Sequence, residues 1–304
     1  MRQAITAELI AVIVAVTNGE PRILTIDAGH ALPSGPFAAS HRSLQAALRE
    51  WVERQTHHPL GYVEQLYTFA DRDRAPAGGK RVVSISYLGL TRETRAAGAA
   101  EAGWQDWYRY FPWEDRRAQF GATAHDPIRP QLQAWAEAAD NTATQLIRQQ
   151  RVALAFGFGE TDWNEELVLQ RYELLYEAGL VPEGDANAEA PPVPGEPLAH
   201  DHRRILATGI ARLRAKIKYR PVVFELMPPQ FTLLQLQRAV EALAGRRLHK
   251  QNFRRLIEQQ ELVEETGAIT VEPRGRPAKF FRFRRAVVAE RAVGTTRLPL
   301  ARSV

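Results

Sequence analysis

The sequence contains no cysteine and only two methionines in 304 residues. The absence of cysteine excludes disulfides, thiolate metal sites and cysteine nucleophiles. The one long apolar run near the start, Leu9 to Val16, is too short to cross a bilayer. It also lacks the basic flank and the small-residue cleavage site of a signal peptide. We therefore interpret this run as a buried strand and expect a cytoplasmic protein with no membrane segment.

Composition places the chain among proteins that bury sizeable cores. It is 45% hydrophobic and 25% charged, which is ordinary for a soluble protein. This balance excludes a wholly disordered chain, a collagen-like chain and a small disulfide-stapled fold. The length is typical of about two domains.

The net charge of +5 is distributed unevenly along the chain. Residues 200–304 hold 22 Lys and Arg against 9 Asp and Glu, whereas residues 1–199 hold 18 basic and 26 acidic residues. Such a division favours an acidic module followed by one that binds a polyanion, and nucleic acid is the partner we expect. The alternative is a basic surface without a partner.

A boundary is visible between the two differently charged parts. The segment from Val181 to Leu198 reads VPEGDANAEAPPVPGEPL, and nothing in it supports a core. We predict a first domain over residues 1–180, a flexible or extended linker over 181–199, a second domain over 200–290 and a tail over 291–304.

The first domain is predicted to be α+β, with strands around one central helix. Strands are expected over residues 5–16, 22–26, 62–70 and 81–90, with Asn18-Gly19 as a hairpin turn and an irregular loop at 33–36. Apolar residues at helical spacing predict an amphipathic helix over 41–55. An aromatic stretch, WQDWYRYFPWED, is followed by helices predicted over 129–154 and 163–178.

The order of elements in the second domain is that of a winged helix-turn-helix. A basic helix over 202–218 precedes a helix that Thr232 caps and Gly245 ends, and a second helix follows over 249–259. Two strands, 261–272 and 278–285, then flank a basic tip at residues 274–277.

The second helix is predicted to read DNA. Phe253, Leu256 and Ile257 serve as its anchors, which leaves polar and basic side chains facing outward toward base edges and phosphates. The alternative is a solvated basic helix on a small α/β domain. The predicted DNA-binding residues are Thr232, Lys250, Gln251, Asn252, Arg254, Arg255, Arg274, Arg276 and Lys279.

The stretch that begins at Gly35 resembles the Nudix box, the loop and helix in which Nudix hydrolases hold carboxylates that bind Mg²⁺ against a diphosphate. Gly35, Arg49, Glu50 and Glu53 match the motif. Three positions depart from it: the early glutamate is His41, the last metal-binding glutamate is Arg54 and the closing glycine is Thr56.

These departures argue against catalysis. Arg54 places a fixed positive charge beside the metal position, where it repels a cation but attracts a phosphate. We therefore predict a domain that is not an enzyme, with no catalytic residue and no resident metal. Two alternatives stay open, an ordinary amphipathic helix and an active Nudix pyrophosphatase that cleaves ADP-ribose or NADH.

A degenerate Nudix domain joined to a winged helix resembles the Nudix-related (NrtR-like) transcriptional regulators of NAD metabolism. The stretches PPQFTLLQLQRAVEALAGRRLHKQNFRRLIE and GRPAKFFRF look like that family's helix-turn-helix and wing. LPSGPF, YVEQLYTFADRDR, RVVSISYLGLTR and YFPWEDRR look closer still to the NadQ type of alphaproteobacteria. The resemblance implies a Nudix-like α/β/α sandwich domain followed by a winged helix-turn-helix domain.

The resemblance also implies partners and a role. Members of this group are dimeric repressors that sense nicotinamide or adenine nucleotides and bind operators upstream of NAD biosynthesis genes. We therefore expect a homodimer, double-stranded operator DNA and an effector nucleotide, which is NAD(H), ATP or ADP-ribose. A nucleotide-sensing RNA-binding protein is a further alternative, against which the absence of RRM-type and KH-type signatures weighs.

The effector is expected near the Nudix helix and the strands beside it. Asp71 and Arg74 alternatively form only a surface ion pair, and the tryptophans, which are candidates for stacking on a base, alternatively belong to the core or to a dimer interface. The predicted ligand-binding residues are Arg49, Glu50, Glu53, Arg54, Tyr67, Asp71, Arg72, Arg74, Trp107 and Trp113.

Overall fold

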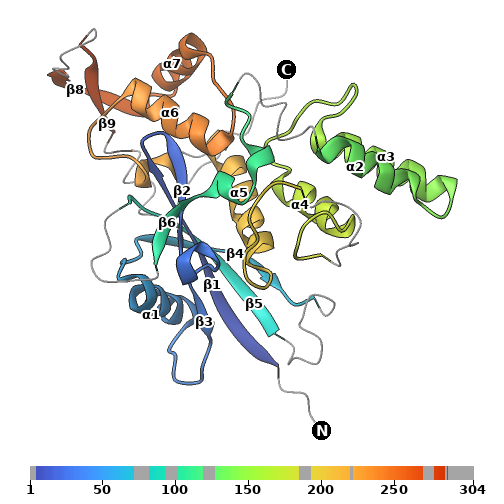
Figure 1. The fold of residues 1–304 in the computed structure, drawn as a ribbon. Helices are drawn as coiled ribbons and strands as arrows, with labels where there is room; N and C mark the ends of the chain where they lie inside the picture. Colours follow the sequence, from blue (N-terminus) through green and yellow to red (C-terminus); the bar gives the residue numbers. More distant parts are fainter. Residues whose placement is uncertain are drawn as a thin grey trace.

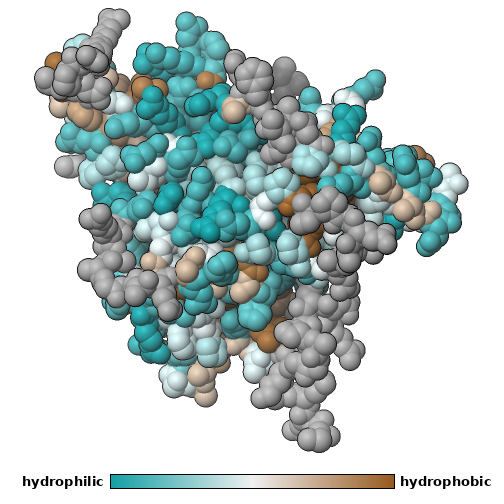
Figure 2. Space-filling model, viewed as in Figure 1, coloured by the Kyte–Doolittle hydropathy of each residue, from teal (hydrophilic) through white to brown (hydrophobic). Residues whose placement is uncertain are grey.

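The computed structural model describes residues 5–71, 82–93, 102–118, 127–184, 193–219, 222–269, 277–284 and 286. The predicted tail and the middle of the predicted linker lie outside the described residues. Among the described residues, no helix is both long and apolar enough to span a membrane. Hydrophilic side chains dominate the described surface in the view of Figure 2, and hydrophobic side chains show only in small, separate areas.

The first part of the chain forms a mixed sheet (Figure 1). Its strands are β1 (Thr6–Thr17), β2 (Glu20–Thr25), β3 (Ser34–Pro36), β4 (Tyr62–Phe69), β5 (Val82–Leu90) and β6 (Gly103–Asp106). The order is β4-β5-β1-β2-β6, with β3 paired to β1, and only the β1–β5 pair is parallel. Asn18 and Gly19 both have positive φ, as the predicted hairpin turn requires.

The two faces of the sheet follow from the alternation of side chains along β1. Leu9, Ala11 and Ile13 pack in one cluster with the inner face of α1 (Leu44–Thr56), whereas Ile10, Val12 and Val14 pack in the other. The helix on this second face is α5 (His202–Tyr219), and its Gly209 lies so near the sheet that a β-carbon there would come within 2.8 Å of Val12 Cγ1. The α/β/α sandwich is therefore confirmed, and one of its layers is a helix from beyond the predicted linker.

Three further helices differ from the prediction. A single helix over 129–154 is wrong, because the chain forms α2 (Ile128–Glu137) and α3 (Thr142–Phe156). Asn141 separates them as the N-cap of α3, and its side chain accepts a hydrogen bond from Thr144 N at 2.8 Å. The third helix, α4 (Val168–Glu177), begins five residues later than the predicted start at residue 163. Figure 1 shows α2 and α3 projecting from the body of the molecule.

The prediction that the linker supports no core is wrong at both of its ends. Val181, Val193 and Leu198 are buried, each less than 5% exposed, in the cluster that also contains α4 and α5. The amide of Val193 donates a hydrogen bond to Leu180 O at 3.0 Å. The few apolar residues at the two ends of this segment therefore pack into the core. The boundaries of the domains remain predictions.

The second part of the chain has the predicted winged-helix order. A 3-10 turn, η4 (Val222–Glu225), is followed by β7 (Phe231–Thr232), α6 (Leu233–Ala244), α7 (Lys250–Gln259), β8 (Val263–Ile269) and β9 (Lys279–Phe283). The three strands form a sheet in the order β7-β9-β8. Thr232 caps α6 within a full capping box, and Gly245 ends it at φ 71°.

The aromatic stretch forms an edge strand and two short helical turns. Strand β6 pairs with β2, and the chain then continues through η2 (Trp107–Arg109) and η3 (Pro112–Glu114). Residues 107–117, which we call the bridging segment, run from the end of β6 to the helix-turn-helix. No strand was predicted here, because four residues are too few to show an alternating pattern.

Candidate nucleic-acid interface and ligand site

Helix α7 presents a polar face to solvent. Phe253 and Ile257 are buried at 7% and 8% exposure and hold the helix on the domain, as predicted. Leu256 was expected to be a third anchor, but it is 51% exposed, because it lies at the edge of the buried face, about 100° around the helix from Ile257. The exposed polar residues of the helix include Lys250, Gln251, Asn252, Arg254 and Arg255.

A hydrogen-bond network fixes how α7 follows α6. Glu241, near the end of α6, accepts from Gln237 Nε2 and from Leu248 N, both at 2.9 Å, and pairs with Arg247 at 3.1 Å. Burial alone would raise the pKa of the Glu241 carboxyl, but these donors and the Arg247 charge lower it below its ordinary value. The turn that positions the predicted recognition helix is thus tied together by one carboxylate.

The predicted contacts at the start of α6 and in the wing are already engaged within the protein. The Thr232 hydroxyl accepts from Gln235 N at 3.2 Å as a helix cap, and the residue is only 8% exposed. Lys279 Nζ lies 2.8 Å from Glu265 on the neighbouring strand. Arg274 and Arg276 lie outside the described residues. On α7, the basic side chains of Lys250, Arg254 and Arg255 form no ion pair with a described carboxylate.

Part of the uneven charge distribution serves contacts within the chain. Many basic side chains on α5 and near the end of α6 pair with carboxylates of the first 199 residues. These pairs are Arg203–Glu183, Arg204–Asp71, Arg204–Glu173, Arg214–Glu114, Lys216–Glu64, Lys218–Glu165, Lys218–Glu166 and Arg246–Glu165. The excess of basic residues after residue 200 therefore overstates the charge that is available to a polyanion.

The Nudix-like helix α1 is fastened to β3 by its aromatic and amide side chains. Trp51 Nε1 donates to Pro36 O at 3.1 Å, and Gln55 bonds both backbone groups of Ser34, at 3.1 and 2.8 Å. The indole of Trp51 covers Gly35 so closely that a β-carbon at Gly35 would lie 2.2 Å from Cδ2. The first glycine of the box is thus required by packing.

In the stretch that resembles the Nudix box, the charged side chains pair with one another. Arg54 pairs with Glu50 at 2.5 Å across one helical turn, and its guanidinium lies 4.8 Å from the centre of the Trp51 ring. His41 Nε2 lies 4.0 Å from the same Glu50 carboxylate. Glu53 is exposed, and the described residues contain no group of three or more His, Asp or Glu that could hold a metal.

Arg49 has a structural role. Its guanidinium donates to the backbone carbonyls of Leu60 and Gly61, the second at 2.9 Å. These bonds fix the loop that leads from α1 into β4. A contact of Arg49 with an effector remains a prediction, although these donors are already occupied.

Burial contradicts the two predicted stacking residues, whereas a ligand contact of Asp71 stays a prediction. Trp107 and Trp113 are fully buried in the core, so no ligand ring can stack on them. Asp71 pairs with Arg204 of α5 at 2.6 Å, a partner that the sequence does not reveal because it lies 133 residues away. Tyr67, in contrast, is 57% exposed beside Phe69 and remains a candidate. Arg72 and Arg74 lie outside the described residues.

A cluster of His58, Thr91 and Trp104 lies at the carboxyl end of β5. None of these residues was among the predicted ligand-binding residues. His58 Nε2 lies 3.1 Å from Thr91 Oγ1, and the rings of His58 and Trp104 are perpendicular, with 5.7 Å between centroids. Arg22 Nη2 donates to Trp104 O at 2.6 Å, and burial lowers the pKa of His58. The pair His57-His58 after a helix carries no sequence signal for this arrangement, because strands and a loop that are distant in the sequence have to come together to form it.

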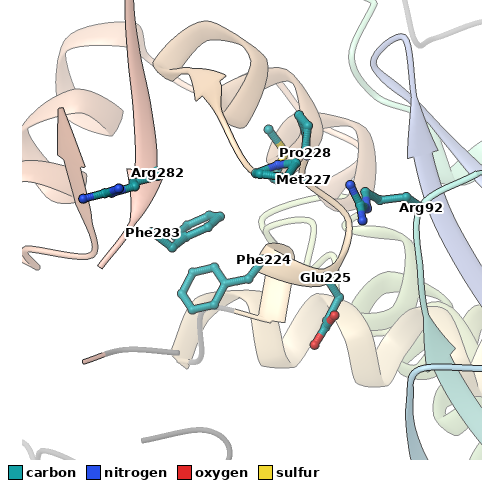
Figure 3. Close-up of a pocket in the computed structure, with 8 residues that line it drawn as sticks. Arg92, Phe224, Glu225, Met227, Pro228, Arg282 and Phe283 are labelled. Carbon is teal, nitrogen blue, oxygen red and sulfur yellow. The ribbon is translucent and has the colours of Figure 1, made fainter. Parts of the chain in front are cut away.

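A hollow separates the end of β5 from the wing (Figure 3). Its volume is about 360 Å³, and Arg92 borders it on the side of the sheet. The rings of Phe224 and Phe283 form its aromatic side, with 3.7 Å between centroids. Residues from η4 and β9 thus meet a residue of the Nudix-like part at one small cavity.

These features define a two-part protein, in which a Nudix-type sandwich is combined with a winged helix-turn-helix. Residues 223–283 match the NrtR DNA-binding winged helix domain family. The chain is 41% identical over 86 residues to the ADPR responsive transcriptional repressor NtrR of Acinetobacter baylyi, a match that covers 28% of this chain and 34% of that relative. The match therefore spans about a third of the length of the curated relative.

Solved structures show the same fold over almost the whole chain. The structure of Shewanella oneidensis NrtR complexed with a 27mer DNA matches with a TM-score of 0.55 and 19% identity, covering 93% of this chain and 95% of that one. A MutT/nudix family protein from Enterococcus faecalis matches with a TM-score of 0.53 and 16% identity, covering 93% and 88%. The predicted fold and the resemblance to NrtR-like proteins are confirmed, whereas closeness to the NadQ type stays a prediction.

Proposed function

We propose that this chain is a transcriptional repressor that binds double-stranded operator DNA through α7 and senses a nucleotide through its Nudix-type domain. One observation carries the proposal. The exposed face of α7 holds Lys250, Arg254 and Arg255, which no described carboxylate neutralises, and it lies within the segment that matches the NrtR winged helix family.

The chemistry of this face suits the major groove. A helix of this kind enters the groove with its N-terminal residues at the base edges. Gln251 and Asn252 are exposed there and have the amide groups that bond adenine, while Arg254 and Arg255 offer guanidinium groups for guanine or phosphate. Lys250 supplies a further charge toward the backbone.

A homodimer is part of the proposal. A single winged helix contacts too few base pairs for tight and specific binding, and a second copy doubles the site read. The Shewanella relative was solved with a DNA of 27 nucleotides, a length that accommodates two half-sites about one helical turn apart.

The effector we propose is ADP-ribose, with NAD(H) and ATP as the alternatives to test beside it. The name of the Acinetobacter relative states that it responds to ADPR. Glu50, Glu53 and Arg54 are accessible on the Nudix-like helix, Tyr67 is accessible on β4, and all four remain proposed contacts. Because Arg54 neutralises Glu50, we propose that the domain binds its nucleotide without hydrolysing it.

The biological role that we propose is repression of NAD biosynthesis genes in the cytoplasm, where the bound form is associated with the nucleoid. The concentration of the effector nucleotide would then control the expression of these genes. The regulation requires that the effector bind the DNA-competent and DNA-incompetent forms with different affinities.

The test compares two double variants by fluorescence anisotropy on duplex DNA from upstream of the NAD biosynthesis genes. Arg254→Ala with Arg255→Ala should weaken binding at least about tenfold, since each contact contributes about 1–3 kcal/mol. The matched control, Arg282→Ala with Arg284→Ala, removes two charges of the same domain that are already paired with Glu264 and Glu261, and should change the affinity little. Equal effects of the two double variants would remove α7 as the recognition helix.

A second assay addresses the alternative function. The protein is incubated with Mg²⁺ and ADP-ribose or NADH, and AMP release is measured. We expect no release, and Mg²⁺-dependent release would establish a working pyrophosphatase with an attached DNA-binding domain.

A further inference from the structure

The bridging segment joins the two parts of the protein through buried contacts. Trp107, Tyr110, Phe111 and Trp113 have no exposed surface, and Tyr108 is only 6% exposed. The segment begins where β6 leaves the edge of the Nudix-like sheet and ends beside the turn between α6 and α7. It is therefore packed as part of the core along most of its length.

The segment and α5 together satisfy the last carbonyl groups of α6. A helix leaves its final carbonyls without partners inside the helix. The Tyr108 hydroxyl donates to Ala242 O at 2.7 Å, Arg214 Nε donates to Leu243 O at 2.9 Å, and Arg116 N donates to Gly245 O at 2.7 Å. The C-terminal end of α6, which leads directly to the recognition helix, is thus held by groups from outside the winged-helix family match.

A buried carboxylate holds one of these donors in place. Glu114 accepts from Arg171 at 2.5 and 2.9 Å and from Arg214 Nη1 at 2.5 Å, and all three side chains are fully buried. Arg214 also donates to Glu114 O at 3.2 Å. Because such groups are costly to leave unpaired, this arrangement resists small displacements of the segment.

The segment is also fastened to the Nudix-like part of the chain, at its middle and at its last residue. The Tyr110 hydroxyl donates to Gly29 O at 2.5 Å, and Arg117 Nη1 donates to Gly19 O, at the tip of the β1–β2 hairpin, at 2.7 Å. Figure 1 shows this hairpin reaching toward α6. Movements of β2 or β6 therefore pass directly into the segment.

We infer that the bridging segment couples the Nudix-like sheet to the recognition helix, and that Tyr108 is the positioning residue at which this coupling enters α6. The inference rests on the proposed function. An effector that shifts the sheet moves the segment, and the Tyr108–Ala242 bond transfers the movement to the end of α6 and so to α7. Burial raises the pKa of Tyr108 to about 12, so its hydroxyl keeps its proton at neutral pH.

The segment contains its own matched control. Tyr108 and Tyr110 are both buried, and each donates its hydroxyl to a backbone carbonyl. Tyr108 reaches α6, whereas Tyr110 reaches Gly29 beside the sheet. The variants Tyr108→Phe and Tyr110→Phe each delete one buried hydrogen bond and keep the ring, so they differ in the element that loses its donor.

The first readout is hydrogen exchange of the full-length protein without DNA. Tyr108→Phe should speed exchange of the amides around the end of α6, Gly245 and Leu248 included, by about fivefold, the effect of one net hydrogen bond. Tyr110→Phe should leave these amides at the wild-type rate. Unchanged exchange in Tyr108→Phe, or the same change in both variants, would overturn the inference.

The second readout is the response of operator affinity to ADP-ribose. Tyr108→Phe should reduce the effector-induced change in Kd by about fivefold. Tyr110→Phe should reduce it as well, because it removes the bond between the segment and Gly29, although it leaves the end of α6 unchanged in the exchange experiment. A full response in Tyr108→Phe would also overturn the inference. If the wild-type protein binds no operator, the proposed function fails, and the exchange experiment still decides whether the segment holds α6.

Discussion

The indole ring of Trp51 lies directly over Gly35, so that a β-carbon at position 35 would come within 2.2 Å of the ring. This contact joins the loop strand β3 to the Nudix-like helix α1, and the bonds of Gln55 to Ser34 reinforce it. Packing thus holds together the loop and helix that resemble a Nudix box, in which we propose that Arg54 takes the place of a metal-binding glutamate.

Gly35→Ala should therefore destabilise the protein by about 1–3 kcal/mol, because the ring has to move to admit a methyl group. Gly61→Ala is the matched control, since a β-carbon there meets nothing within 4 Å. Urea unfolding measures both, and the control should stay within about 0.5 kcal/mol of wild type. Equal losses of stability in the two variants would contradict the packing argument.

Restoring the glutamate of the box should restore affinity for a cation. Arg54→Glu replaces the partner of Glu50 with a third carboxylate within one turn of α1. We expect Mg²⁺ to raise the thermal unfolding temperature of this variant but not that of the wild type. Arg42→Glu, the same charge change on an exposed residue just before the helix, should show no Mg²⁺ effect; an equal response there would mean non-specific charge attraction.

Glu114→Gln should destabilise the protein strongly, by about 3–5 kcal/mol, because two buried guanidinium groups lose their counter-charge. Glu177→Gln, which removes the exposed partner of Arg151, should cost about 0–1 kcal/mol.

Burial alone would raise the pKa of Glu114, but Arg171 and Arg214 lower it below the ordinary 4.5. Its contribution to stability is therefore present above pH 4.5 and is lost as the pH falls through the lower folded value. Unfolding curves of the wild type and Glu114→Gln that differ equally at pH 7 and at low pH would contradict this account.

His202 should make the protein less stable as the pH falls from 6.5 to about 4. Burial and the nearby His200 lower the pKa of His202 to about 4, and its Nδ1 accepts from Leu32 N at 3.0 Å. The unfolded chain takes up the proton in this window and the folded chain does not, so acid favours unfolding. His202→Asn keeps an acceptor near Leu32 and removes the titration, so its stability should change less across the window. An unchanged pH profile would show that other groups dominate.

The sequence predicted elements whose signals are local. The hairpin at Asn18-Gly19, the cap at Thr232 and the end of α6 at Gly245 each depend on one residue type at one backbone conformation. The outward face of α7 follows from helical spacing in the same way.

Contacts between residues that are far apart in the sequence could not be predicted from it. The apolar face of α5 shows that the helix is buried but not that it covers the Nudix-like sheet at Gly209. Arg203 and Arg214 add to the basic charge of the second half, yet both are buried against carboxylates of the first. Trp107 and Trp113 are equally consistent with a ligand site and a core until their surroundings are known.

The most direct test of the account is a titration of the full-length protein on duplex DNA from upstream of the NAD biosynthesis genes, with and without ADP-ribose. NAD, NADH and ATP are titrated in parallel, and a scrambled duplex is the control. The account predicts binding specific to the upstream DNA and a change in Kd of about fivefold or more with one nucleotide. Equal affinity for the scrambled duplex, or a Kd that no nucleotide alters, would contradict it.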